Sequence, residues 1–172
     1  MVIVITGNGK GKTTSALGQA LRSIGDGKKV LMVQFIKGPW RSGEDDSHKL
    51  LAPHFKIVKT GLGFVGILGD MLPRQEHARA AQKGLKLARE EMQSGKWNIL
   101  ILDEINNAIK LELVSLPEVL KFVHDLPEGM DLILTGRDAS QALIDKADIV
   151  SEVKEIKHMH NSGVKGKKGL EW

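Results

Sequence analysis

Residues 7–14 read GNGKGKTT, a run whose residue types can hold a chain of phosphates. Glycines let successive backbone N–H groups turn inward and form a nest for phosphate oxygens. An apolar run precedes these residues and a helical pattern follows them, so the helix N-terminus adds a partial positive charge. Lys12 can reach the terminal phosphates, and the Thr13 hydroxyl can bind Mg²⁺.

The spacing of this run departs from the general phosphate-loop pattern G-x-x-x-x-G-K-[ST]. That pattern requires glycine at position 6, where this chain has Thr6, so the first glycine comes one residue late. A glycine-rich turn between strand and helix, with Gly-Lys-Thr arising by chance, is the alternative interpretation. The flanking strand and helix favour the phosphate loop.

A second set of candidate residues, Asp103 and Glu104, ends the apolar run 97–102. In phosphate-loop proteins an acid at such a strand end holds the metal ion, directly or through water. Solvated acids that merely cap a strand end are the alternative. The phosphate loop earlier in the chain favours the metal site.

The elements that must position these residues follow from the alternation of apolar runs and helical patterns along the whole chain. This alternation predicts a single α/β domain over 1–172 with a mostly parallel central sheet flanked by helices. Two long loops, 38–54 and 60–73, are predicted to be functional because loops of this length are uncommon in a small domain. Strands are predicted over 2–5, 30–36, 55–59, 98–102, 131–135 and 149–153, and helices over 14–24, 74–94, 116–126 and 139–146.

Composition excludes several classes of protein. The 172 residues contain no cysteine, which excludes a disulfide scaffold, a thiolate zinc site, an iron–sulfur cluster and a thiol nucleophile. The formal net charge of +4 suits an anionic ligand, whereas 4% aromatic residues and no tyrosine do not favour a nucleic-acid partner. No apolar run is long enough to span a membrane and no signal peptide is evident, so we expect a cytoplasmic protein with no membrane partner.

Taken together, the motifs resemble those of the corrinoid adenosyltransferases of the CobA/BtuR/CobO type, which transfer the adenosyl group of ATP to cobalamin. The resemblance covers essentially the whole chain, and the late first glycine is a feature of that family. It rests on TGNGKGKTT at 6–14, VQFIKG at 33–38, GE at 43–44, GLGF at 61–64, LDEINNA at 102–108, LTGR at 134–137, KH at 157–158 and GVK at 163–165.

The resemblance implies a RecA-like P-loop fold and a homodimer. It implies that reduced cobalt, Co(I), attacks the 5′ carbon of ATP and that triphosphate leaves, giving adenosylcobalamin or adenosylcobinamide. ATP and the corrinoid are then substrates, Mg²⁺ or Mn²⁺ is the metal, and a flavoprotein supplies electrons. A P-loop hydrolase or kinase, or a RecA-like nucleic-acid-binding ATPase, is the alternative.

Matching positions carry the family's site residues onto this chain. Lys12, Thr13 and Glu104 would be catalytic, and Thr13 and Glu104 would hold the metal with Asp103 in support. Arg137 would contact phosphate or the corrinoid, with a surface salt bridge as the alternative. The nucleotide would be bound by Gly7, Asn8, Gly9, Lys10, Gly11, Lys12, Thr13, Thr14 and Arg22, with Asn8 and Arg22 near the nucleoside.

The corrinoid side of the site departs from some relatives. Phe64 matches the aromatic residue that pushes the corrinoid's lower ligand off cobalt, but a tryptophan two residues later is replaced by Gly66. Either Phe64 works with other apolar groups, such as Val65 or Leu68, or the lower ligand is displaced differently. Trp40 either contacts the corrinoid or packs in its loop. Some relatives also carry a segment before the first strand that covers the site; here the corrinoid pocket is either more open or closed by the basic segment 157–172.

The six histidines are not expected to bind metal. His48, His54, His77 and His124 are predicted to be solvated, and the pair His158 and His160 is too short a pattern to indicate a metal site.

Overall fold

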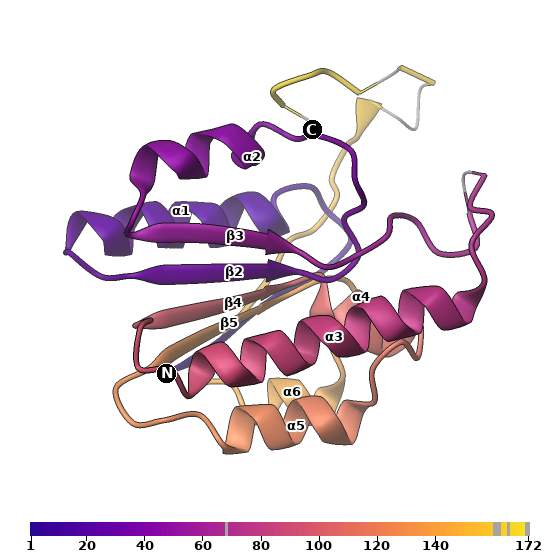
Figure 1. The fold of residues 1–172 in the computed structure, drawn as a ribbon. Helices are drawn as coiled ribbons and strands as arrows, with labels where there is room; N and C mark the ends of the chain where they lie inside the picture. The colour runs from indigo at the N-terminus through magenta and orange to yellow at the C-terminus, as the bar shows by residue number, and fades with distance from the viewer. Residues whose placement is uncertain (68, 160–162, 165, 171–172) are drawn as a thin grey trace.

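The computed structural model describes residues 1–67, 69–159, 163, 164 and 166–170, so Leu68, His160 and Lys165 lie outside the described residues. Figure 1 shows one α/β layer structure in which short strands alternate with helices. The elements are β1 Val2–Thr6, α1 Lys12–Gly25, β2 Val30–Gln34, α2 Glu44–Ser47, the 3₁₀-helix η1 His48–Leu51, β3 Phe55–Lys59, α3 Arg74–Met92, β4 Ile99–Asp103, α4 Ile105–Lys110, α5 Leu116–His124, β5 Asp131–Thr135, α6 Gln141–Ile144 and β6 Ile149–Glu152.

The central sheet has the strand order β3-β2-β4-β5-β1-β6, and every neighbouring pair is parallel. All strands therefore point to the same edge, where the loop after β1 and the ends of β2, β4 and β5 meet (Figure 1). Ligands of open parallel sheets bind at this carboxyl edge. The predicted α/β fold with a parallel central sheet flanked by helices is confirmed.

Each face of the sheet buries its own core because successive side chains of a strand point to opposite faces. On β4, Leu100 and Leu102 pack with α3 and α5, whereas Ile99 and Ile101 pack with α1. Figure 1 shows α1 and α2 on one face and α3, α5 and α6 on the other. Since both faces are covered, the inner strands β2, β4, β5 and β1 read as nearly continuous apolar runs, whereas the edge strand β6 is exposed along its length.

Most predicted elements lie within two residues of their expected bounds, but three short ones were missed. The region 38–54, expected to be a loop, contains α2 and η1, and α4 follows directly after Glu104. The prediction for His77 was wrong, because its side chain is buried in the first turns of α3. Among the described residues, no helix is both long and apolar enough to cross a membrane.

Candidate active site

The phosphate-loop residues connect β1 to α1 and pack against the chain that leaves β6. The Gly9 N–H donates to the Val153 carbonyl oxygen at 2.7 Å, and the Val153 N–H donates to the Thr6 carbonyl oxygen at 2.8 Å. Gly7 has φ of 104°, and a Cβ atom there would overlap the Val153 backbone. Only glycine fits at position 7, both for its conformation and for this close approach.

Lys12 begins α1 and points back into the loop. Its side chain is buried, and Nζ donates to the Gly9 carbonyl oxygen at 2.8 Å. An ammonium group has three N–H donors, so within the described chain two remain for an anionic ligand. Burial lowers the pKa of Lys12, an effect that the nearby Glu104 carboxylate opposes. The loop thus holds a largely desolvated cation.

The Asp103 carboxylate joins three strands to the phosphate loop. Oδ1 accepts hydrogen bonds from the Thr13 hydroxyl at 2.9 Å and the Thr135 hydroxyl at 2.7 Å, and Oδ2 accepts from Gln34 Nε2 at 3.0 Å. The Asp103, Thr135 and Gln34 side chains are buried at the ends of β4, β5 and β2. This network fixes Thr13 against the acidic pair.

Glu104 takes an unusual backbone conformation next to Asp103. Its φ of 63° and ψ of 21° lie in the left-handed region, and its N–H donates to Thr135 Oγ1 at 2.9 Å. Burial and the Asp103 carboxylate raise the pKa of Glu104. No hydrogen bond to its carboxylate occurs among the residues that the structure describes, so this group is free to bind a cation. A residue in a strained backbone conformation of this kind is typical of a functional site.

The residues at this edge fit a divalent cation. Two carboxylates and the Thr13 hydroxyl supply the hard oxygen donors that Mg²⁺ prefers. Gln34 Oε1, beside Asp103, is a buried acceptor without a partner in the described chain. No group of three or more His, Cys, Asp or Glu side chains that could hold a metal occurs in the described part. A cation here must take its remaining ligands from phosphates and water, as Mg²⁺ commonly does.

Two exposed aromatic rings lie at the ends of β2 and β3. The ring centroids of Trp40 and Phe64 are 5.4 Å apart with planes tilted by 36°, and the side chains are 59% and 43% exposed. The Gly63 N–H donates to the Ile36 carbonyl oxygen at 3.1 Å, so the two loops run together. A Cβ atom on Gly63 would lie 2.7 Å from the Trp40 ring, so the absence of a side chain at Gly63 allows the ring to pack directly against its backbone.

The remaining predicted residues lie at different distances from the loop. Asn8, Lys10 and Thr14 are exposed around it. Arg137 follows β5, is exposed, and lies near enough for its charge to act on both Lys12 and Glu104. Arg22 is exposed on α1 ten residues beyond Lys12, about 15 Å along the helix axis. Within one chain the structure does not bring Arg22 to the loop, and its predicted role stays a prediction.

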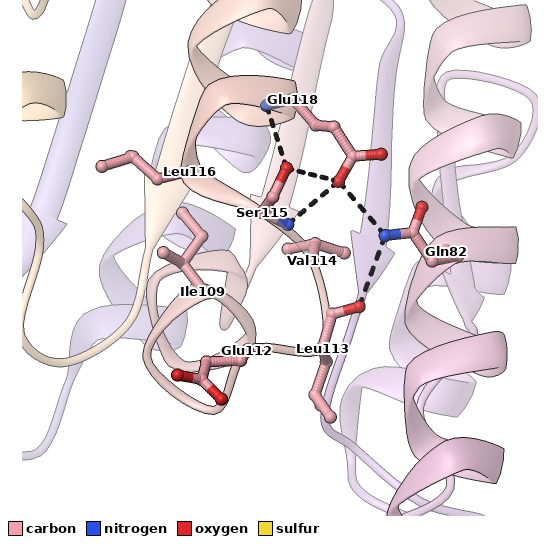
Figure 2. Close-up of a pocket in the computed structure, with 8 residues that line it drawn as sticks. All are labelled: Gln82, Ile109, Glu112, Leu113, Val114, Ser115, Leu116 and Glu118. Carbon is pink, nitrogen blue, oxygen red and sulfur yellow. Dashed lines mark hydrogen bonds between the residues drawn. The ribbon is translucent and has the colours of Figure 1, made fainter.

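Two surface cavities lie away from the phosphate loop. One of about 450 Å³ lies between α3 and the start of α5 (Figure 2). Its polar groups satisfy one another, because Ser115 and Glu118 form a capping box and Gln82 Nε2 donates to Glu118. Another of about 470 Å³ is lined in part by Val65 and Asp70 of the loop after Phe64.

Comparison with known proteins identifies the family. A family model described as ATP:corrinoid adenosyltransferase BtuR/CobO/CobP matches residues 1–172. The corrinoid adenosyltransferase of Escherichia coli K12 is 35% identical over 175 residues, covering 100% of this chain and 85% of its own. The chain belongs to the ATP:corrinoid adenosyltransferases. Corrinoid adenosyltransferase CobA of Salmonella typhimurium is 34% identical with the same coverage.

Among solved structures, the ATP:corrinoid adenosyltransferase chain aligns with a KaiC-like protein from Pyrococcus horikoshii. The alignment covers 91% of this chain and 74% of the other, with 19% identity and a TM-score of 0.49. So low a score adds nothing to the assignment, which rests on the family model and the full-length relatives.

Sequence reasoning missed the roles of two residues in this adenosyltransferase. Gln34 and Thr135 lie in segments that carried the family resemblance, yet neither was assigned a function. Each is a polar residue that ends a buried apolar strand, as Asp103 does. That shared pattern was the available signal, since ends of parallel strands meet at one edge of the sheet.

Proposed function

We propose that this corrinoid adenosyltransferase transfers the 5′-deoxyadenosyl group of ATP to the Co(I) centre of a reduced corrinoid and releases intact triphosphate. The products would be adenosylcobalamin or adenosylcobinamide. Transfer from ATP to a corrinoid is the activity of the family to which the chain belongs. The observation that carries the mechanism is the cluster of Lys12, Thr13, Asp103 and Glu104 at the mouth of the glycine loop.

In this reaction the electron pair of Co(I) forms a cobalt–carbon bond to the 5′ carbon. The bond from that carbon to the phosphate oxygen breaks, and its electron pair leaves on triphosphate, so cobalt is formally oxidised to Co(III). No proton has to move, and catalysis therefore depends on positioning and charge stabilisation. The N–H groups of the loop and Lys12 would stabilise the departing charge.

Thr13 and Glu104 would hold Mg²⁺ or Mn²⁺, with Asp103 fixing the Thr13 hydroxyl at 2.9 Å. When bound, the cation supplies positive charge to the triphosphate. Charge from Arg137 also reaches Glu104 and Lys12, which supports a role for Arg137 toward phosphate rather than only in a surface salt bridge.

Phe64 and Trp40 would face the corrinoid, with Phe64 displacing its lower ligand so that cobalt is more easily reduced. Their exposed, adjacent rings support this assignment. From the family resemblance we further propose a cytoplasmic homodimer that receives electrons from a flavoprotein, with the segment 157–172 folding toward the corrinoid.

The identity of the phosphate product tests this proposal. With ATP, Mg²⁺ and chemically reduced cobalamin, we expect inorganic tripolyphosphate in equal amount to the light-sensitive adenosylated corrinoid, because the bond at the 5′ carbon breaks. Phosphorus NMR of the quenched mixture measures both quantities. Stoichiometric ADP without tripolyphosphate would instead support the hydrolase or kinase alternative, which the family match does not favour.

Replacing Phe64 with alanine tests the corrinoid side separately. We expect a loss of roughly 10²-fold in the reaction that starts from cob(II)alamin and a mild reductant, because a misplaced or missing positioning group costs that much. With chemically made Co(I) the loss should be much smaller. Leu62→Ala, a similarly exposed residue of the same loop, is the matched control. Equal losses by both routes would make Phe64 a packing residue, and Gly66→Trp tests the idea in the opposite direction.

A further inference from the structure

One carboxylate organises the loop that follows Phe64. Asp70 Oδ2 accepts hydrogen bonds from the Gly66 N–H at 2.8 Å and from His77 Nε2 at 3.0 Å. Oδ1 accepts from the Leu72 N–H at 3.0 Å, and the Asp70 N–H donates to the Ile67 carbonyl oxygen at 3.1 Å. Two points of the loop are thereby tied to the start of α3.

The Asp70–His77 pair is buried beneath a loop that is otherwise open to solvent. Its side chains are 8% and 2% exposed, whereas Ile67 and Met71 in the same loop are 59% and 93% exposed. Hydrogen bonds from the Gly66 and Leu72 N–H groups hold the pKa of Asp70 below its ordinary value, so the carboxylate is ionised at neutral pH. Burying such a group costs free energy unless donors surround it, as they do here.

Phe64 lies between this anchor and a second one. Gly63, before it, is held by the Ile36 carbonyl oxygen and by the Trp40 ring. Gly66, two residues after it, is held by Asp70. Both ends of the short segment that carries Phe64 are therefore fixed, while the ring itself stays 43% exposed.

We propose that Asp70 and His77 are positioning residues that hold Phe64 in the orientation needed to displace the corrinoid's lower ligand. This inference rests on the role proposed above for Phe64. Without the pair, the glycine-containing loop would have to be ordered when the corrinoid binds, at a cost in conformational entropy. With the Asp70–His77 pair in place, the loop is already ordered when the protein folds, so the site is preorganised for the corrinoid.

Asp70→Asn is the primary test. The amide keeps an oxygen that can accept from Leu72, but its NH₂ group cannot accept from the Gly66 N–H. We expect roughly a tenfold loss or more with cob(II)alamin and a mild reductant, and a change within about twofold with chemically made Co(I). Glu76→Gln, which changes a half-exposed acid on the same turn of α3, is the matched control and should change neither rate.

His77 provides a second, independent variant. His77→Phe keeps an aromatic side chain but removes the donor to Asp70, so it should lose activity with cob(II)alamin and a mild reductant but not with chemically made Co(I). His77→Gln keeps an N–H donor and should be more active than His77→Phe in the cob(II)alamin reaction. If Asp70→Asn fails to fold, judged by circular dichroism, this pair carries the test. Electron paramagnetic resonance of bound cob(II)alamin reports directly on the lower nitrogen ligand, which should remain on cobalt in the loss variants.

A double variant separates positioning from general packing. In the Phe64→Ala background, Asp70→Asn should cause no further loss, because Asp70 acts through Phe64. Losses that multiply, or an equal loss of Asp70→Asn by both routes, would overturn the inference. If Phe64→Ala loses no more activity from cob(II)alamin than from chemically made Co(I), the role proposed for Phe64 is wrong, and so is the positioning role of Asp70 and His77. A selective Phe64 effect without an Asp70 effect refutes only the positioning pair.

Discussion

Lys12→Ala is expected to lower kcat/KM for ATP by roughly 10²–10³-fold, the cost of removing one preorganised donor to a developing anion. Lys12 lies inside the loop, where two of its N–H donors have no partner in the described chain, and no other lysine or arginine begins α1. The fold should survive, because burial lowers the pKa of Lys12 and the ligand-free protein gains little from keeping a charge there. ATP titration and turnover, with circular dichroism on the same samples, measure both effects.

The control for this change is Lys86→Ala, which removes a 79% exposed lysine from α3 and should leave ATP binding and turnover unaltered. Native circular dichroism together with near wild-type activity of Lys12→Ala would show that the triphosphate binds elsewhere. A loss of both fold and activity would mean that Lys12 mainly stabilises the loop through Gly9.

Glu104→Gln should lower the activity by roughly 10²-fold and at the same time raise the stability of the folded protein without ligand. Burial, and then the Asp103 carboxylate, raise the pKa of Glu104. The folded protein therefore binds this proton more tightly than the unfolded chain, so stability falls as pH rises from the ordinary carboxyl pKa through the raised value. Glutamine cannot ionise, and it removes this penalty.

The stabilisation should consequently depend on pH. We expect a melting temperature about 2–4 °C higher than wild type near pH 8, which corresponds to about 1 kcal/mol in a domain of this size. Near pH 4 the difference should shrink, since the wild-type carboxyl is then protonated as well. Glu90→Gln, which changes an exposed acid on α3, is the control and should leave the melting temperature unchanged near pH 8 and near pH 4. A lower melting temperature at pH 8 would mean that Glu104 is paired in the folded protein.

The fold was largely predictable because four of its strands, β1, β2, β4 and β5, are largely buried on both faces and carry nearly unbroken apolar runs. The helix predicted over 74–94 was equally clear, since Ala81, Leu85 and Ala88 repeat at helical spacing over several turns. In contrast, α2 and α4 have four and six residues, too few for a period of 3.6 to be recognised. The burial of His77 could have been anticipated, because it precedes Ala81 by four residues on the face that packs inward.

The candidate site was predictable only where its residues are adjacent in sequence. Lys12 and Thr13 form one motif, and Asp103 and Glu104 another. Asp103 also accepts hydrogen bonds from Thr135 and Gln34. These bonds form only because β2 and β5 both pair with β4 in a fixed register. No local sequence pattern predicts that strand pairing, and none predicts the hydrogen bond between Asp70 and His77.

The contact between the phosphate loop and the chain after β6 has a consequence for synthesis on the ribosome. Gly9 is held by Val153, so the conformation of the phosphate loop depends on a residue that is translated long after the loop itself. Domains are made from the N-terminus onward at a limited rate. The phosphate loop of the nascent chain therefore lacks this hydrogen bond while α1, β2 and β4 are assembling, and it gains the bond only after β6 has joined the sheet.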